Sequence, residues 1–264
     1  MHAASAHEIL AGLEQYGIRL GLDHLRELAG DLGHPERSTP ALIVAGTNGK
    51  GSVAALLASI ARAAGLDAGL YTSPHLENVE ERIRVDGREI ASADLGGLLR
   101  EVTSAARRIG HPSPTYFEAM TLSALLHFAR RKVDLAVLEV GMGGRLDATN
   151  LVDARLAVIT AIALDHQEWL GPTVDAIARE KAGVLRAGCP VVLSPQTPEA
   201  LDALLEEAAG RGGPGAARGP GGAHGDRRRA GDSRGPTTPG VPAVRPGPAR
   251  PSPFRSRSRY RWRN

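Results

Sequence analysis

Two patterns of apolar positions alternate along the first 210 residues. Short continuous apolar runs are typical of strands buried on both faces of a sheet. Longer segments, in which apolar positions recur every three to four residues, are typical of amphipathic helices. We expect strands at residues 41–45, 68–71, 135–140, 157–162 and 191–194. We expect helices at residues 7–16, 22–32, 52–64, 92–109, 115–130, 174–186 and 198–209, and a hairpin over residues 82–90.

This alternation predicts an α/β fold, with a mostly parallel sheet and helices on both of its faces. The hairpin, which turns at Asp86-Gly87, would add a small antiparallel part. In an open sheet of this kind, ligands bind beyond the carboxyl ends of the strands. We therefore look for chemistry in the loops that follow each strand.

The loop after the first strand has the composition of a phosphate-binding loop. Its glycines let several N–H groups converge on one anion, and the start of the following helix adds partial positive charge. Lys50 adds a full charge, and Ser52 is a candidate Mg²⁺ ligand. The common pattern G-x-x-x-x-G-K-[ST] is not met, because Gly51 separates these two residues, and a purely structural turn is the alternative. The loop consists of Gly46, Thr47, Asn48, Gly49, Lys50, Gly51 and Ser52.

The loop after the second strand holds two hydroxyls and an imidazole. Ser73 is a candidate second hydroxyl ligand for Mg²⁺. Pro74 alone would justify a structural turn at this place. His75 is equally compatible with a hydrogen bond inside the loop and with a contact to substrate.

Glu139 lies at the end of a buried strand, where a carboxylate is costly without compensation. A metal ion that also binds nucleotide phosphates would supply that compensation, and an ion pair with Arg145 is the alternative. The glycine-rich loop that follows would allow close approach of a ligand. We expect Asp147 and Asn150 in this loop to bind donor groups of that ligand.

His166 follows a further strand, and Lys181 lies in a later helix. A histidine at a strand end is often a structural residue, although its position on the side of Glu139 makes a role as ligand equally reasonable. The residues alone predict that Lys181 is a solvated charge.

Seven segments, in this order, resemble those of the folylpolyglutamate synthases and the bifunctional dihydrofolate synthases of bacteria. They are GTNGKGS, YTSPHL, ERI, TYFEAMT, EVGMGGRLDATN, LDHQEWLG and IAREKAG. The resemblance covers about residues 10–207, and the related Mur ligases share the phosphate loop and the general fold. It implies an ATP-dependent ligase that adds L-glutamate to a folate or to dihydropteroate through an acyl phosphate.

The resemblance also implies roles for individual residues, with ATP and Mg²⁺ as cofactors. Lys50 would hold the β- and γ-phosphates; Ser52, Ser73 and Glu139 would bind the first magnesium ion, and His166 would help to bind a second. Lys181 would be carbamylated and so become an oxygen ligand. Asp147 would meet the pterin ring, whereas the role of Thr115 and Glu118 in their motif stays open.

The charge of the chain changes abruptly near residue 210. Residues 1–210 carry 19 Lys and Arg against 27 Asp and Glu, whereas residues 211–264 carry 13 Arg, no Lys and two acids. The second part also holds 11 Gly and 9 Pro, so it cannot build a core. We expect an ATP-binding domain at residues 1–210 and a disordered tail at 211–264, which a frameshift would explain. The tail would replace a ligase domain and impair activity.

Two alternatives remain at this point. One is a nucleotide-binding protein that uses the basic tail on RNA, and the other is a Mur-type ligase of a cell-wall precursor. We prefer the folate ligase, acting as a cytoplasmic monomer without nucleic-acid or membrane partners. Cys189 is the single cysteine, no signal peptide opens the chain, and the longest apolar run is too short for a membrane helix.

Overall fold

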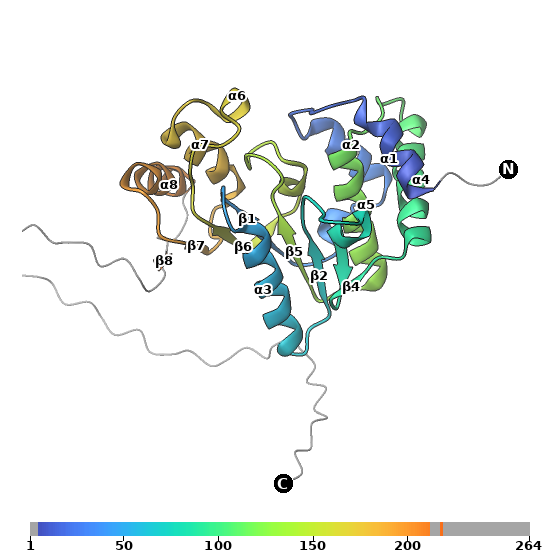
Figure 1. Cartoon of the computed structure of the whole chain (residues 1–264), viewed down its shortest axis with the longest axis horizontal. Helices are drawn as coiled ribbons and strands as arrows, with labels where there is room; N and C mark the ends of the chain where they lie inside the picture. Colours follow the sequence, from blue (N-terminus) through green and yellow to red (C-terminus); the bar gives the residue numbers. More distant parts are fainter. Residues whose placement is uncertain (1–4, 212–216, 219–264) are drawn as a thin grey trace, which may run out of the picture. The chain divides into compact units, whose positions relative to one another are not determined.

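The computed structural model describes residues 5–211 and 217–218, which form one eight-stranded sheet with helices on both faces (Figure 1). The strand order is β4-β3-β2-β5-β1-β6-β7-β8. The predicted fold class, a mostly parallel α/β sheet, is confirmed. The strands are β1 (Ala41–Ala45), β2 (Ala68–Tyr71), β3 (Ile83–Val85), β4 (Arg88–Glu89), β5 (Leu135–Glu139), β6 (Ala154–Ile159), β7 (Val191–Leu193) and β8 (Ala217–Arg218).

The centre of the sheet places three loops next to one another. Strand β1 pairs in parallel with β5 on one side and with β6 on the other, so that Val44 lies opposite both Glu139 and Val158. The loops after β1, β5 and β6 therefore leave the same edge of the sheet. Strand β2 pairs in parallel with β5 and antiparallel with β3, which forms the predicted hairpin with β4.

The helices agree closely with the predicted ones, with short 3₁₀ turns between them. The α-helices are α1 (Ala6–Glu14), α2 (Asp23–Asp31), α3 (Lys50–Ala63), α4 (Ser92–Arg108), α5 (Tyr116–Arg131), α6 (Gln167–Leu170), α7 (Val174–Lys181) and α8 (Pro198–Gly210). The 3₁₀ turns are η1 (Pro35–Arg37), η2 (Val79–Arg82), η3 (Ala148–Leu151) and η4 (Ala182–Val184). None of the helices in the described part of the chain is long and apolar enough to cross a membrane.

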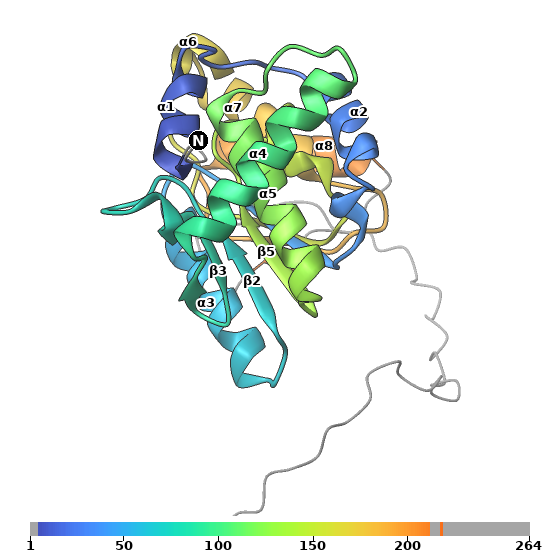
Figure 2. The ribbon, with the colours of Figure 1, turned by 90° about the vertical axis from the view of Figure 1, so that its right-hand side faces the viewer.

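Both faces of the central strands are apolar because helices cover each of them. Val44 and Val137 pack with Ala54 and Ala58 of α3 on one face. Ile43 and its neighbours belong to the larger core on the opposite face, where α5 and α4 lie (Figure 2). This double cover explains why the strands read as continuous apolar runs.

Three boundaries differ from the sequence prediction. Strand β6 spans residues 154–159 rather than 157–162, because its length follows its pairing with β1, which ends where Ala45 meets Ile159. The helix expected over 174–186 ends at Lys181 and continues as η4. The short helix α6 was not predicted, since four residues are too few to show a helical period.

The predicted tail at residues 211–264 lies almost entirely outside the described residues, and so does its expected disorder. Within it, Ala217–Arg218 form β8, where we expected no secondary structure. This pair lies parallel to Val192 and Leu193 of β7. An edge strand presents unpaired backbone groups, so it can accept a neighbour with little regard to sequence. The domain boundary near residue 210 stays a prediction.

Candidate functional site

The loop between β1 and α3 presents backbone donors at the start of a helix. Gly49 precedes α3 in a left-handed conformation, and no side chain caps the helix. The first N–H groups of α3 thus have no acceptor within the helix. The loop itself is fixed to the segment after β6, because the Thr47 and Asn48 amides donate to Ala161 O at 2.9 and 3.2 Å. This arrangement suits an anion.

Lys50 and Ser52 lie at the beginning of the same helix. The Lys50 Nζ donates to Thr47 O at 3.1 Å and so lies over the loop. Ser52 is exposed in the first turn of α3. The structure therefore places a cation and a hydroxyl where the sequence predicted them.

Two glycines of this loop are required by close approach. Gly46 has a φ of 137°, and a Cβ there would lie 1.9 Å from Thr160 Oγ1. A Cβ on Gly51 would lie 3.2 Å from Glu139 Oε2. The glycine that breaks the common phosphate-loop pattern thus leaves room for a carboxylate against the helix start, which a purely structural turn would not require.

Glu139 ends β5 beside this loop and is only 5% exposed. Its Oε2 accepts the Ser73 N–H at 3.0 Å. Burial raises the pKa of this carboxyl, opposed by the hydrogen bond from Ser73 and by the charge of Lys50. The alternative pairing with Arg145 is wrong, since Arg145 pairs instead with Glu180 and Glu207.

Lys181, the last residue of α7, is only 2% exposed. Its Nζ donates to Gly46 O at 2.8 Å, so it reaches the phosphate loop from the opposite side of β1. Burial lowers its pKa to about 8, and the nearby charge of Lys50 lowers it further. The prediction of a solvated charge, made from the residues alone, is wrong because α7 packs its carboxyl end against the sheet.

A pocket of about 250 Å³ opens beside the phosphate loop. Its walls come from residues 17–21, from the start of α5 with Phe117, and from the loop after β5 with Met142 and Leu146. His166 also lines it, with a half-exposed ring whose Nε2 lies 3.5 Å from Asp165 Oδ1. This pocket combines apolar walls with a few polar groups, as small-molecule sites do.

Asp147 and Asn150 turn mainly toward their own loop. Asp147 lines the pocket, but its Oδ1 accepts the Thr149 N–H at 2.9 Å and its Oδ2 accepts the Met142 N–H at 2.9 Å. Burial raises its pKa, and these hydrogen bonds oppose the rise. Asn150 is buried and its amide binds backbone carbonyls and Arg186, so the expectation that it reads a ligand is wrong. A substrate contact of Asp147 stays a prediction.

The structure explains the motif whose role the sequence left open. Thr115 Oγ1 accepts the Glu118 N–H at 3.3 Å, and Glu118 Oε2 accepts the Thr115 N–H at 2.8 Å. This capping box begins α5 at the wall of the pocket. Residues 17–21 were missed as a wall, although two glycines around apolar Ile18 and Leu20 were a usable signal.

The donor set around the loop suits magnesium rather than a transition metal. In the described residues, no group of three or more His, Cys, Asp or Glu side chains could hold a metal ion. Glu139 supplies one buried carboxylate, and Ser52 is a hydroxyl at the same loop; Mg²⁺ is commonly held by one or two carboxylates together with phosphate oxygens and water. His75 does not join this set, because its Nδ1 accepts from Arg82 Nε at 2.9 Å.

Known proteins with this sequence and fold share one chemistry in their names. The dihydrofolate synthase/folylpolyglutamate synthase of Escherichia coli is 44% identical over 205 residues, which cover 77% of this chain and 48% of that protein. The probable bifunctional folylpolyglutamate synthase/dihydropteroate synthase of Halobacterium salinarum is 43% identical over 211 residues, which cover 79% and 26%. The chain thus spans about half or less of the length of these curated relatives.

Solved structures give the same result. E. coli FolC in complex with DHPP and ADP is 43% identical, with a TM-score of 0.75 over 82% of this chain and 51% of that one. An FPGS–AMPPCP–folate complex is 37% identical, with a TM-score of 0.75 over 81% and 54%. The model of the Mur ligase middle domain matches residues 44–189, more than half of the chain. The chain therefore belongs to the Mur ligase family, with folylpolyglutamate and dihydrofolate synthases as its relatives.

Proposed function

We propose that this chain carries the nucleotide-binding part of an ATP-dependent ligase that joins L-glutamate to a folate or to dihydropteroate. The observation that carries the proposal is the phosphate loop between two buried charges, Glu139 against Gly51 and Lys181 against Gly46. The pocket lined by Phe117 lies beside it. Relatives are described with ADP, AMPPCP, DHPP and folate, which supports both parts.

In such a ligase, a carboxylate oxygen of the folate or pteroate attacks the γ-phosphorus of ATP, and ADP leaves. The amine of glutamate then attacks the acyl phosphate, and phosphate leaves. The protein contributes position and charge more than covalent chemistry. Lys50 and the first amides of α3 would hold the β- and γ-phosphates, while the pocket beside them would bind the pterin, with Asp147 at its wall.

The oxygen ligands fit magnesium. When bound, Mg²⁺ would neutralise phosphate charge, with Ser52, Ser73 and Glu139 at one ion and His166 and Lys181 at another. For Lys181 to serve, its amine would have to become a carbamate. The lowered pKa of Lys181 supports this step, because only the neutral amine reacts with carbon dioxide and burial increases its share.

Calorimetry on the whole chain tests the proposal at the level of binding, independently of turnover. We expect AMPPCP with Mg²⁺ to bind, and dihydropteroate or folate to bind to the nucleotide complex. A uridine-linked peptide should not bind, and this arm separates the folate ligase from a Mur-type cell-wall ligase. A folded chain that binds neither nucleotide nor pteroate would contradict the proposal.

A further inference from the structure

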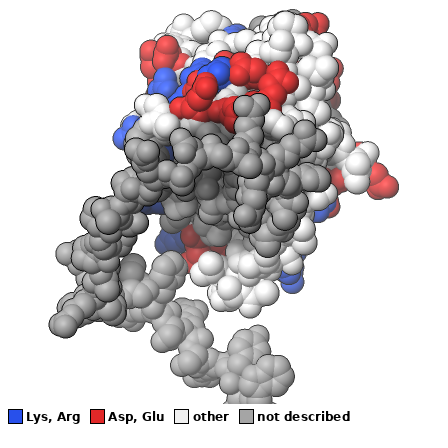
Figure 3. Space-filling model, turned by 90° about the vertical axis from the view of Figure 1, so that its left-hand side faces the viewer, with Lys and Arg blue, Asp and Glu red and all other residues white. Residues whose placement is uncertain are grey.

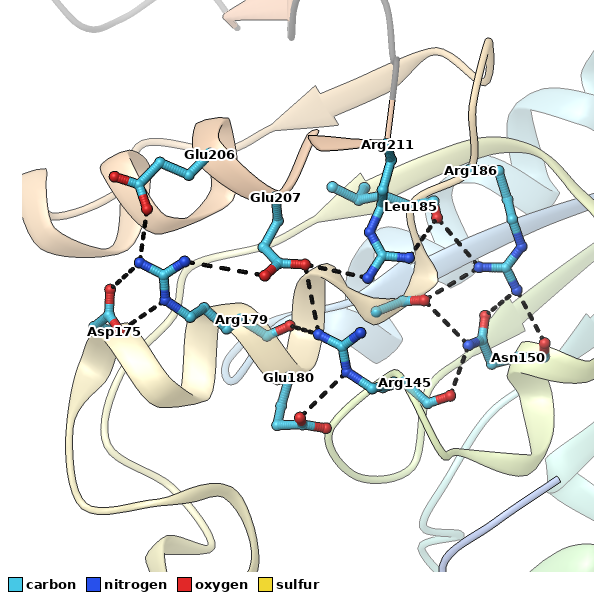
Figure 4. A network of polar contacts seen from close by, with 11 residues as sticks. Arg145, Asn150, Asp175, Arg179, Glu180, Leu185, Arg186, Glu206, Glu207 and Arg211 are labelled. Carbon is cyan, nitrogen blue, oxygen red and sulfur yellow. Dashed lines mark hydrogen bonds and ion pairs between the residues drawn. The ribbon is translucent and has the colours of Figure 1, made fainter. Parts of the chain in front are cut away.

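Charged side chains join the loop after β5 to helices α7 and α8 (Figure 4). The outer part of this network is exposed: Arg179 pairs with Asp175 at 2.9 Å and with Glu206 at 2.7 Å. The side of the molecule on which α7 and α8 lie in Figure 1 accordingly carries basic and acidic side chains next to one another (Figure 3). Exposed pairs of this kind contribute little to stability.

The inner part is different, because Arg145 contacts the backbone at the end of α7. Its N–H donates to Glu180 O at 3.0 Å, and its Nη2 donates to Arg179 O at 3.2 Å. The last carbonyls of a helix lack partners within it and carry partial negative charge. A guanidinium at this place satisfies one of them and balances that charge, so Arg145 acts as a C-terminal cap supplied by another element.

The backbone of the same loop is held against the turn after α7. The Asn150 Nδ2 donates to Arg145 O at 2.9 Å and to Gly183 O at 3.2 Å. A Cβ on Gly183 would lie 2.3 Å from the Cα of Arg145, so only glycine permits this packing. The loop after β5 and the end of α7 therefore form one fixed unit.

Lys181 is the residue that this unit holds in place. It is the last residue of α7, directly after the two residues whose carbonyls Arg145 binds. Its Nζ meets Gly46 O at 2.8 Å across a buried space. A fraying of the last helical turn would move that atom away from the phosphate loop.

We propose that Arg145 is a positioning residue that caps the carboxyl end of α7 and thereby holds Lys181 against the phosphate loop. This inference rests on the proposed function, in which Lys181 serves the ion beside the nucleotide. Arg145 touches neither nucleotide nor ion in this role. It acts through the helix end alone.

The experiment compares Arg145→Ala and Arg145→Lys with the unchanged chain by two readouts. The first is hydrogen exchange of the segment 178–185, followed by mass spectrometry. The second is the gain in AMPPCP affinity on adding Mg²⁺. For Arg145→Ala we expect exchange in this segment to rise about 10-fold and the Mg²⁺-dependent gain to fall about 10-fold, as the loss of one charged hydrogen bond implies. Binding without Mg²⁺ should stay within about twofold. Arg145→Lys, which keeps the charge but not the planar fork, should lie between the two.

Arg211→Ala is the matched control, because Arg211 binds the same Glu207 at 3.1 Å without touching the end of α7. It should leave both readouts unchanged. The proposal is overturned if exchange in 178–185 does not change in Arg145→Ala, or if that variant weakens binding equally with and without Mg²⁺. If the unchanged chain shows no Mg²⁺-dependent gain at all, the proposed function fails, and the exchange readout still decides whether Arg145 holds the helix end.

Discussion

The phosphate loop and the neighbouring pocket share one edge of the sheet but are built in different ways. The loop uses backbone amides, close-packed glycines and two lysines, Lys50 and Lys181, from elements far apart in the chain. The pocket uses side chains of three segments, with Phe117 and Leu146 among its walls. One site is defined by backbone geometry and charge, and the other by shape.

This difference predicts two separable kinds of variant. A change of charge at the loop should affect nucleotide binding and leave the pocket intact. A change of side-chain shape in the pocket should affect the pteroate and leave the nucleotide site intact. The buried lysine stands between them, since its contribution depends on pH as well as on position.

The largest effect is expected for Lys50→Gln. The variant removes the cation that lies over the loop but keeps a side chain of similar length. We expect AMPPCP affinity to fall on the order of 100-fold, or about 3 kcal/mol, as for lost charged hydrogen bonds to phosphate. Calorimetry measures the change, and Lys132→Gln, at the exposed end of α5, is the control. Folate or dihydropteroate should bind unchanged; an equal loss there would mean that the two sites are not separable.

A smaller effect is expected for Lys181→Met, in the pH dependence of stability. The pKa of Lys181 is about 8 in the folded chain, against a model value of 10.5. Between these values the folded state binds fewer protons than the unfolded state, so the free energy of unfolding rises with pH. From pH 7.5 to 9.5 the rise from this group is about 2 kcal/mol.

Urea unfolding in buffer free of carbon dioxide measures this rise. Lys181→Met should lose it, while Lys132→Met should keep it. A rise that persists in Lys181→Met would show that other groups cause it. It would then remove the physical support for a neutral amine at this position.

The comparison also separates what the sequence could and could not predict. Gly46, Lys50 and Ser52 were predictable because a phosphate loop is a local pattern between a strand and a helix. The burial of Lys181 was not, since it follows from the packing of α7 against the sheet, which the resemblance alone suggested. Asn150 was misjudged for the same reason, because its partners lie more than 30 residues away.

The pocket was the less predictable half. Its wall at residues 17–21 lies far in sequence from Phe117 and from the loop after β5. Shape made by distant segments leaves no local motif, whereas a loop of backbone donors does. The fold itself was predictable, because each strand and helix had its own period.

The smallest expected effect tests the pocket alone. Phe117→Leu removes an aromatic ring that lines the pocket and lies close to Gly141, where a Cβ would meet the ring at 2.6 Å. We expect the affinity for dihydropteroate or folate to fall about fivefold, or about 1 kcal/mol, as for the loss of part of an apolar contact surface. Nucleotide affinity should not change.

Tyr116→Leu is the matched control for this last variant, because Tyr116 precedes Phe117 on α5 and packs against Arg82 instead, at 5.1 Å from its ring centre. It loses a ring of similar size without changing the pocket. Equal losses of pteroate affinity in both variants would mean that the start of α5 matters for stability rather than for shape. A loss confined to Phe117→Leu, with nucleotide binding intact, would separate the two halves of the site as the Lys50 variant does from the other side.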